Sequence, residues 1–169
     1  ALKDVSVTID EGEVIGLIGE NGSGKSTLSS IISGVYPQSE GELTLDGKPY
    51  KPADTLDAQN HGISMIAQEM GTLPGIKVAD NLFIGKEQLF TKHGVVDRKK
   101  MYQEARKALE KIGIDNIHPE DPIIKYSLEE RKLVEVVRAL YTNPRIFIVD
   151  ETTTALSQRG RDIIYQVIK

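Results

Sequence analysis

The sequence contains no cysteine and no tryptophan among its 169 residues. Without cysteine the chain forms no disulfide, performs no thiol catalysis and offers no thiolate to a metal, as is typical of cytosolic proteins. Long apolar runs are missing as well. The longest, Val14–Ile18 and Ile146–Val149, are strand-sized and far shorter than the roughly 20 residues of a membrane span. The first residues also lack the apolar region of a signal peptide. We expect a fragment, because the sequence begins with Ala1 and ends at Lys169 inside a helical pattern.

A strong excess of positive charge is also absent. Lys and Arg number 21 against 25 Asp and Glu, which gives a formal net charge of -4. This balance argues against a broad basic surface, so we expect no nucleic-acid partner. Two basic clusters, 98–100 and 106–107, lie in an amphipathic pattern. We interpret them as a solvated helix face, with nucleic-acid contact as the alternative.

Apolar residues first follow strand patterns. They alternate over 5–9, which predicts a half-buried strand, and run continuously over 14–18, which predicts a central parallel strand. A helix is expected over about 25–33. Asp46-Gly47 lies between two short β-prone runs and predicts a hairpin, and 63–66 predicts another strand.

The middle of the sequence is predicted to be helical. One amphipathic helix ends at Gly113, a second begins at Ser127, and a buried strand follows over 145–149 before a last helix from Ala155. The order predicts one α/β domain over 1–169. Its core would comprise about 1–76 and 144–169, with a mostly parallel sheet and a small antiparallel β piece, and a helical subdomain would occupy about 77–143.

A glycine-rich segment between the strand 14–18 and the next helix matches G-x-x-x-x-G-K-[ST]. In this context the pattern predicts a phosphate-binding loop and therefore a P-loop NTPase core. Lys25 would reach the β- and γ-phosphates of a nucleotide, and the Ser26 hydroxyl would bind Mg²⁺. The alternative is an ordinary glycine-rich turn capped by Ser26. The expected nucleotide-binding residues are Gly19, Glu20, Asn21, Gly22, Ser23, Gly24, Lys25, Ser26 and Thr27.

Two acidic residues follow the buried strand over 145–149. Asp150 comes at its carboxyl end, where ligands of open α/β sheets bind, and would supply a second oxygen to the metal. Glu151 follows and would polarise a water molecule for attack on the γ-phosphate. Without the phosphate loop, the interpretation of Asp150 and Glu151 would be an ordinary solvent-exposed turn after a buried strand.

Together these segments resemble the ABC-type ATPases. Ala67-Gln68-Glu69 resembles the Q-loop, Tyr126–Lys132 stands where the family has its signature LSGGQ or LSxGxxQ, and Asp150–Leu156 resembles Walker B with the D-loop. The resemblance implies ATP and Mg²⁺ as cofactors, with Ser26, Gln68 and Asp150 at the metal. It also implies catalytic roles for Lys25, Gln68 and Glu151.

The finer resemblance is to the ATPases of bacterial sugar importers, through segments such as 78–87 and 96–102. It implies an ATP-hydrolysing subunit on the cytoplasmic face of the cell membrane, peripheral to it. Such a subunit pairs head to tail with a second ABC half or protomer and drives a transmembrane permease, here for a monosaccharide. The alternatives are a soluble ABC ATPase acting on ribosomes or DNA and a catalytically impaired ABC half. A P-loop kinase or GTPase is disfavoured because neither an arginine-rich lid nor an N-K-x-D run is present.

Three positions depart from the family pattern. Glu129 replaces the signature glycine, Thr152 the Walker B proline and Ser157 the D-loop aspartate. Glu129 would bring a carboxylate toward the ATP held by the opposite half, which predicts two unequal ATP sites, with Glu129 facing the idle one. Ser127 has two interpretations: the N-cap of a capping box with Glu130, or a γ-phosphate contact.

Overall fold

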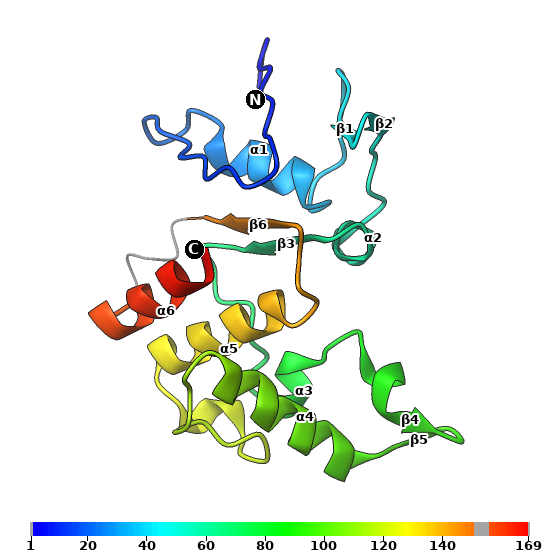
Figure 1. The fold of residues 1–169 in the computed structure, drawn as a ribbon, viewed down its shortest axis with the longest axis vertical. Coiled ribbons are helices and arrows are strands. Elements are labelled where there is room, and N and C mark those ends of the chain that lie inside the picture. Colours follow the sequence, from blue (N-terminus) through cyan, green and yellow to red (C-terminus); the bar gives the residue numbers. More distant parts are fainter. Residues whose placement is uncertain (1, 151–155, 169) are drawn as a thin grey trace.

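The computed structural model describes residues 2–150 and 156–168, and its elements form successive layers (Figure 1). The N-terminal segment and the first helix lie above a small parallel sheet, and the remaining long helices lie below it. The helices are α1 (Lys25–Ile32), α2 (Thr55–Asn60), α3 (Val78–Leu82), α4 (Arg98–Lys111), α5 (Leu128–Leu140) and α6 (Gln158–Ile168), with 3₁₀ turns η1 (Glu87–Phe90) and η2 (Ile123–Lys125). The strands are β1 (Thr44–Leu45), β2 (Lys48–Pro49), β3 (Ile63–Ile66), β4 (Thr91–Lys92), β5 (Val95–Val96) and β6 (Ile146–Val149).

The central sheet consists of β3 and β6, two strands that are far apart in the sequence. They run parallel, with Ile63 opposite Ile146 and Ile66 opposite Val149. The pairing continues one residue further, because the Asp150 amide donates to the Ile66 carbonyl at 3.0 Å. The parallel pair, together with small antiparallel sheets and helices, confirms the predicted α/β class.

The other strands of the described residues form two antiparallel hairpins. The predicted hairpin about Asp46-Gly47 is present as β1 and β2, with both turn residues at positive φ. A second hairpin, formed by β4 and β5, was not expected from the sequence. Each pair has only two residues per strand, so each is a local feature and adds little to the central sheet.

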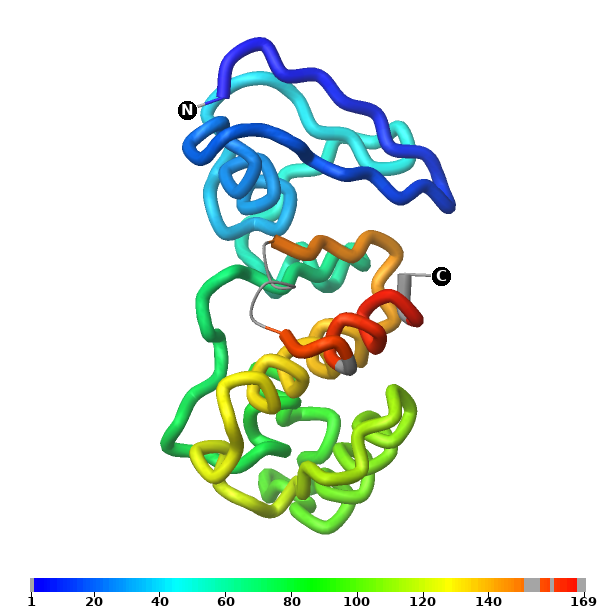
Figure 2. The backbone as a smooth tube through the Cα atoms, turned by 90° about the vertical axis from the view of Figure 1, so that its left-hand side faces the viewer, coloured from blue at the N-terminus to red at the C-terminus, as the bar shows by residue number. Residues whose placement is uncertain are grey.

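The two expected N-terminal strands are the clearest correction. The structure has no strand over 5–9 or 14–18, and the tube in Figure 2 shows this segment running apart from β3 and β6. Val14 is 73% exposed and Ile18 98% exposed. The apolar pattern can indicate a strand, but only pairing creates one. Among the described residues, 14–18 make no ladder with either strand of the central sheet.

The larger hydrophobic core lies below the sheet, between α3, α4 and α5. Its fully buried members include Phe83, Met101, Leu109 and Val136. A smaller cluster of Tyr50, Ala58 and Ile63 lies near β3. Within the described residues, no helix has the length and apolar character needed to cross a bilayer.

Candidate nucleotide-binding site

The glycine-rich segment before α1 is closed by its own lysine. The ammonium of Lys25 donates to the carbonyls of Gly19 at 2.8 Å and Glu20 at 3.0 Å. A turn hydrogen bond from the Ser23 amide to the Glu20 carbonyl, 3.1 Å, tightens the same segment. The loop therefore folds back on Lys25, and its backbone amides lead directly into the N-terminus of a helix.

Geometry requires glycine at position 24 and brings Gly19 close to the Ser23 side chain, which can rotate away. Gly24 caps α1 with φ 96°, a left-handed conformation that other residues adopt only with strain. At Gly19, a Cβ atom would lie 2.6 Å from the Ser23 hydroxyl oxygen. The cap position makes no side-chain hydrogen bond to the helix. The first amides of α1, with the positive end of the helix dipole, are thus available to an anion such as a phosphate.

Asp150 and Gln68 follow the carboxyl ends of the two paired parallel strands. Asp150 is partly buried and comes directly after β6, while Gln68 is exposed, two residues after β3. Because Ile66 and Val149 are opposite each other, both side chains belong to the same edge of the sheet. The predicted catalytic Glu151 lies outside the described residues.

These donors fit a magnesium ion chemically. Ser26 offers a hydroxyl, Asp150 a carboxylate and Gln68 an amide oxygen, and Mg²⁺ prefers oxygen ligands. The described part of the chain contains no group of three or more His, Asp or Glu that could hold a metal by itself. Because Mg²⁺ usually keeps several water ligands and binds substrate phosphates beside one or two carboxylates, a magnesium ion here would take its remaining ligands from nucleotide phosphates and water.

The start of α5 is a complete capping box. The Ser127 hydroxyl accepts from the Glu130 amide, while the Glu130 carboxylate accepts from the Ser127 amide at 2.9 Å and from its hydroxyl at 2.9 Å. This confirms the capping interpretation of Ser127. The hydroxyl is engaged within its own helix terminus.

Glu129 turns toward α6. Its carboxylate accepts hydrogen bonds from both the amide and the hydroxyl of Ser157, the residue just before α6. The Ser157 hydroxyl in turn accepts from the Gly160 amide at 3.4 Å. Glu129 and Ser157, two residues that depart from the family pattern, are therefore hydrogen-bonded to each other. In this chain the negative charge of Glu129 lies at the positive end of the α6 dipole.

Three polar residues of α5 reach the segment 67–71, and the apolar pattern of the helix did not reveal them. Lys132 and Glu135 form an ion pair at 2.9 Å, with side chains only 3% and 4% exposed. Arg138 donates to the Gly71 carbonyl at 3.2 Å, and burial lowers the pKa of Arg138. Their spacing of three residues was the available signal, since it places all three along one side of the helix. Removing one partner of such a buried pair typically costs about 3–5 kcal/mol.

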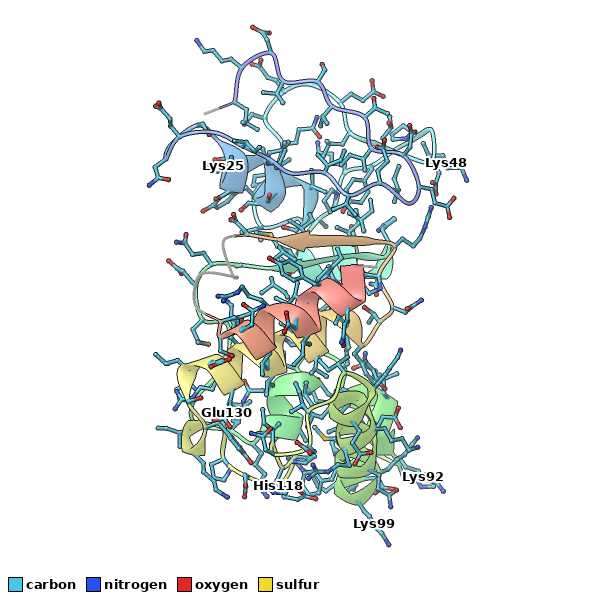
Figure 3. The ribbon with its side chains drawn as sticks, turned by 60° about the vertical axis from the view of Figure 1, so that its left-hand side comes forward. Lys25, Lys48, Lys92, Lys99, His118 and Glu130 are labelled. Atoms are coloured by element: carbon cyan, nitrogen blue, oxygen red, sulfur yellow. The ribbon has the colours of Figure 1, made fainter. Side chains whose placement is uncertain are left out.

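The segments that resemble the family motifs lie on one side of the molecule. The phosphate loop, the carboxyl ends of β3 and β6, and the N-terminus of α5 all lie on the left in Figure 1. Figure 3 shows Lys25 and Glu130 on the left of the turned view as well. Because β3 and β6 run parallel, the residues that follow each strand, Gln68 and Asp150 among them, lie on this side.

Comparison with known proteins places these features in a family. The family described as "ABC transporter" matches residues 2–154. The chain is 39% identical over 168 residues to the ribose import ATP-binding protein RbsA 2 of Escherichia coli O157:H7. It is 40% identical over 168 residues to RbsA of Shouchella clausii. Each alignment covers 99% of this chain but only 33% and 34% of those proteins, so the chain spans about one third of their length.

Solved structures of ATP-binding cassettes have the same fold as this chain. A dimeric post-hydrolysis state of the ATP-binding cassette MJ0796 bound to ADP and Pi superposes with a TM-score of 0.79 at 26% identity, covering 99% of this chain and 72% of that one. The MJ1267 ATP-binding cassette of an ABC transporter gives 0.77 at 30% identity, covering 97% and 68%. They confirm the expected P-loop NTPase core. Since the family match runs through the phosphate loop, the Gln68 segment, the start of α5 and Asp150, the chain belongs to the ABC transporter family.

Proposed function

We propose that this chain is the ATP-binding and hydrolysing cassette of a sugar importer, within one nucleotide-binding domain. The core would comprise about 1–76 and 144–169, and the helical subdomain about 77–143. The proposal depends above all on the phosphate loop, which Lys25 closes at the N-terminus of α1. The sugar class is supported by the names of the relatives, which are ribose import ATP-binding proteins.

Each proposed role follows from the chemistry of the residue. Residues 19–27 would bind the phosphates of ATP through backbone amides and the Lys25 ammonium. Ser26, Asp150 and Gln68 would hold Mg²⁺, which neutralises charge on the phosphates when bound. Glu151 would accept a proton from the attacking water, and Gln68 would orient that water.

The partners are a second ABC half or protomer and a transmembrane permease. One of the solved relatives is a dimeric ATP-binding cassette. A head-to-tail arrangement would bring the start of α5 from one half to the phosphate loop of the other. The complex would lie at the cytoplasmic face of the membrane, with this chain peripheral to it.

Substitutions at Lys25 and Glu151 test the proposal. In the intact protein, Lys25→Ala should abolish Mg·ATP turnover and weaken nucleotide binding, because the ammonium meets the phosphates. Glu151→Gln should also stop turnover but leave binding intact, since it removes only the proton acceptor. Turnover is followed by phosphate release and binding with a fluorescent ATP analogue. Wild-type turnover by either variant would refute the role of that residue.

A further inference from the structure

One buried ammonium group holds the backbone on both sides of Gln68. The Nζ atom of Lys132 donates to the carbonyl of Ala67 at 2.6 Å and to the carbonyl of Glu69 at 3.1 Å. The Gln68 side chain is itself exposed. Because the peptide units 67–68 and 69–70 are bound to the same nitrogen, Lys132 restricts the backbone from which the Gln68 side chain projects.

Two further residues of α5 hold the end of the same segment. A carboxylate oxygen of Glu135 accepts from the Gly71 amide, and Arg138 donates to the Gly71 carbonyl at 3.2 Å. The approach is close: a Cβ atom on Gly71 would lie 3.0 Å from an Arg138 nitrogen. Residues 67–71 are thus fastened to α5 at Ala67, Glu69 and Gly71.

The buried ion pair of Lys132 and Glu135 forms hydrogen bonds to the backbone of 67–71 that apolar side chains could not form. Lys132 and Glu135 are almost wholly removed from water, and such burial is costly unless further hydrogen bonds satisfy the charges. Here those bonds go to the backbone of 67–71. A pair of apolar residues would pack in the same place but would leave these carbonyls and this amide without their partners.

We propose that Lys132 is a positioning residue for Gln68. Through the carbonyls of Ala67 and Glu69 it fixes where the Gln68 amide meets the metal ion and the attacking water, and Glu135 keeps Lys132 in place. The inference rests on the role proposed for Gln68 in ATP hydrolysis. It also links α5, whose first turn belongs to the signature segment, to the segment that follows β3.

The double variant Lys132→Met/Glu135→Gln in the intact protein tests this role. It removes the ammonium together with the carboxylate that pairs with it, and the amide oxygen introduced at position 135 can still accept from the Gly71 amide. Arg138 loses the nearby charge of Glu135 but keeps its hydrogen bond to the Gly71 carbonyl. We expect the Mg²⁺ concentration for half-maximal turnover to rise, or kcat to fall, by about tenfold or more, since small misplacements of catalytic groups have effects of this size. Nucleotide affinity measured in EDTA should be unchanged, because the phosphate loop is untouched.

The matched control is Lys107→Met/Glu104→Gln on α4. This is also a Lys–Glu pair three residues apart, but Lys107 is exposed and Glu104 only partly buried, with an N–O separation of 3.6 Å. It should leave kcat, the Mg²⁺ requirement and nucleotide affinity at wild-type values. If Lys132→Met/Glu135→Gln behaves in the same way, the positioning role is refuted.

Combining the double variant with Gln68→Ala separates positioning from general stability. If Lys132 acts through Gln68, the double variant should cause little further loss in the Gln68→Ala background. Losses that multiply would refute the positioning role while leaving that of Gln68 intact. Normal turnover by Gln68→Ala alone would refute both. Should the double variant not fold, Lys132→Gln/Glu135→Gln, which keeps an amide NH2 donor at position 132 and leaves no buried carboxylate without its cation, takes its place in the same measurements.

Discussion

Lys25 holds the phosphate loop in shape from within. A lysine ammonium has three N–H groups, and two of them donate to the carbonyls of Gly19 and Glu20. One N–H group therefore remains for a phosphate oxygen. In the proposed role, this ordered loop would leave a nucleotide little to rearrange when it binds.

Glu129 makes a contact that the sequence did not predict. Its carboxylate is bonded to Ser157 of the same chain, so Glu129→Ala should lower the free energy of unfolding by about 1 kcal/mol, as for the loss of a helix cap. Turnover should remain largely intact, because the prediction of unequal sites places Glu129 at the idle one. Urea denaturation and phosphate release measure the two effects.

The exposed Glu110 of α4 supplies the control for that experiment. Glu110→Ala should change neither the unfolding free energy nor the rate of phosphate release. If Glu129→Ala stops turnover as completely as Lys25→Ala, the two sites are not unequal in the predicted way. Glu129 would then have a direct part in hydrolysis.

Single residues differ in how well the sequence predicts them. The capping box of Ser127 and Glu130 was predictable because both partners lie within one helical turn. The bonds from Lys132 to Ala67 and Glu69 were not, since they join residues more than 60 positions apart. Helical spacing shows which side of α5 a residue occupies but not which segment that side will meet.

At the scale of elements, one ion pair joins the β1–β2 hairpin to the start of β6. Arg145 donates to both carboxylate oxygens of Asp46, at 2.7 and 2.9 Å. These hydrogen bonds hold the pKa of Asp46 below its ordinary value of 3.8. A lowered pKa means that the pair stabilises the fold above pH 3.8. This contribution is lost as the pH falls through the pKa of the folded state.

An NMR titration of the Asp46 carboxyl carbon checks this prediction. In the wild-type chain the midpoint should lie below 3.8, and Arg145→Met should move it upward, because the guanidinium is the main cause of the shift. Lys48→Met is the comparison, since Lys48 has only a minor effect on the same carboxyl. A midpoint that Arg145→Met leaves in place would show that the two side chains are not paired in solution.

Elements defined by local signals were predicted better than elements defined by pairing. The helix α4 ends just before Gly113, as its local pattern predicted, and begins after the cap Asp97. The strands expected over 5–9 and 14–18 are not formed. An apolar run shows that a segment can be buried, whereas a strand needs a partner, which the run does not identify.

At the scale of the whole molecule, packing is uneven. The helices below the sheet share one large core, in which Phe83, Met101 and Val136 are fully buried. The N-terminal segment exposes apolar side chains, among them Val14 and Ile18. The phosphate loop lies between this segment and α1, whose apolar side chains are only partly buried, so the proposed ATP site lies outside the large core.

Amide hydrogen exchange should reveal this division. We expect slow exchange in α4 and α5 and fast exchange over 5–9 and 14–18, because few buried contacts oppose local opening there. Mg·ATP should slow exchange over 19–27, since bound phosphates would occupy those amides, and Lys25→Ala should abolish that slowing. Nucleotide-free amides over 14–18 that exchange as slowly as those of α5 would mean that this segment is paired in solution, and that the strand predicted from its apolar run forms after all.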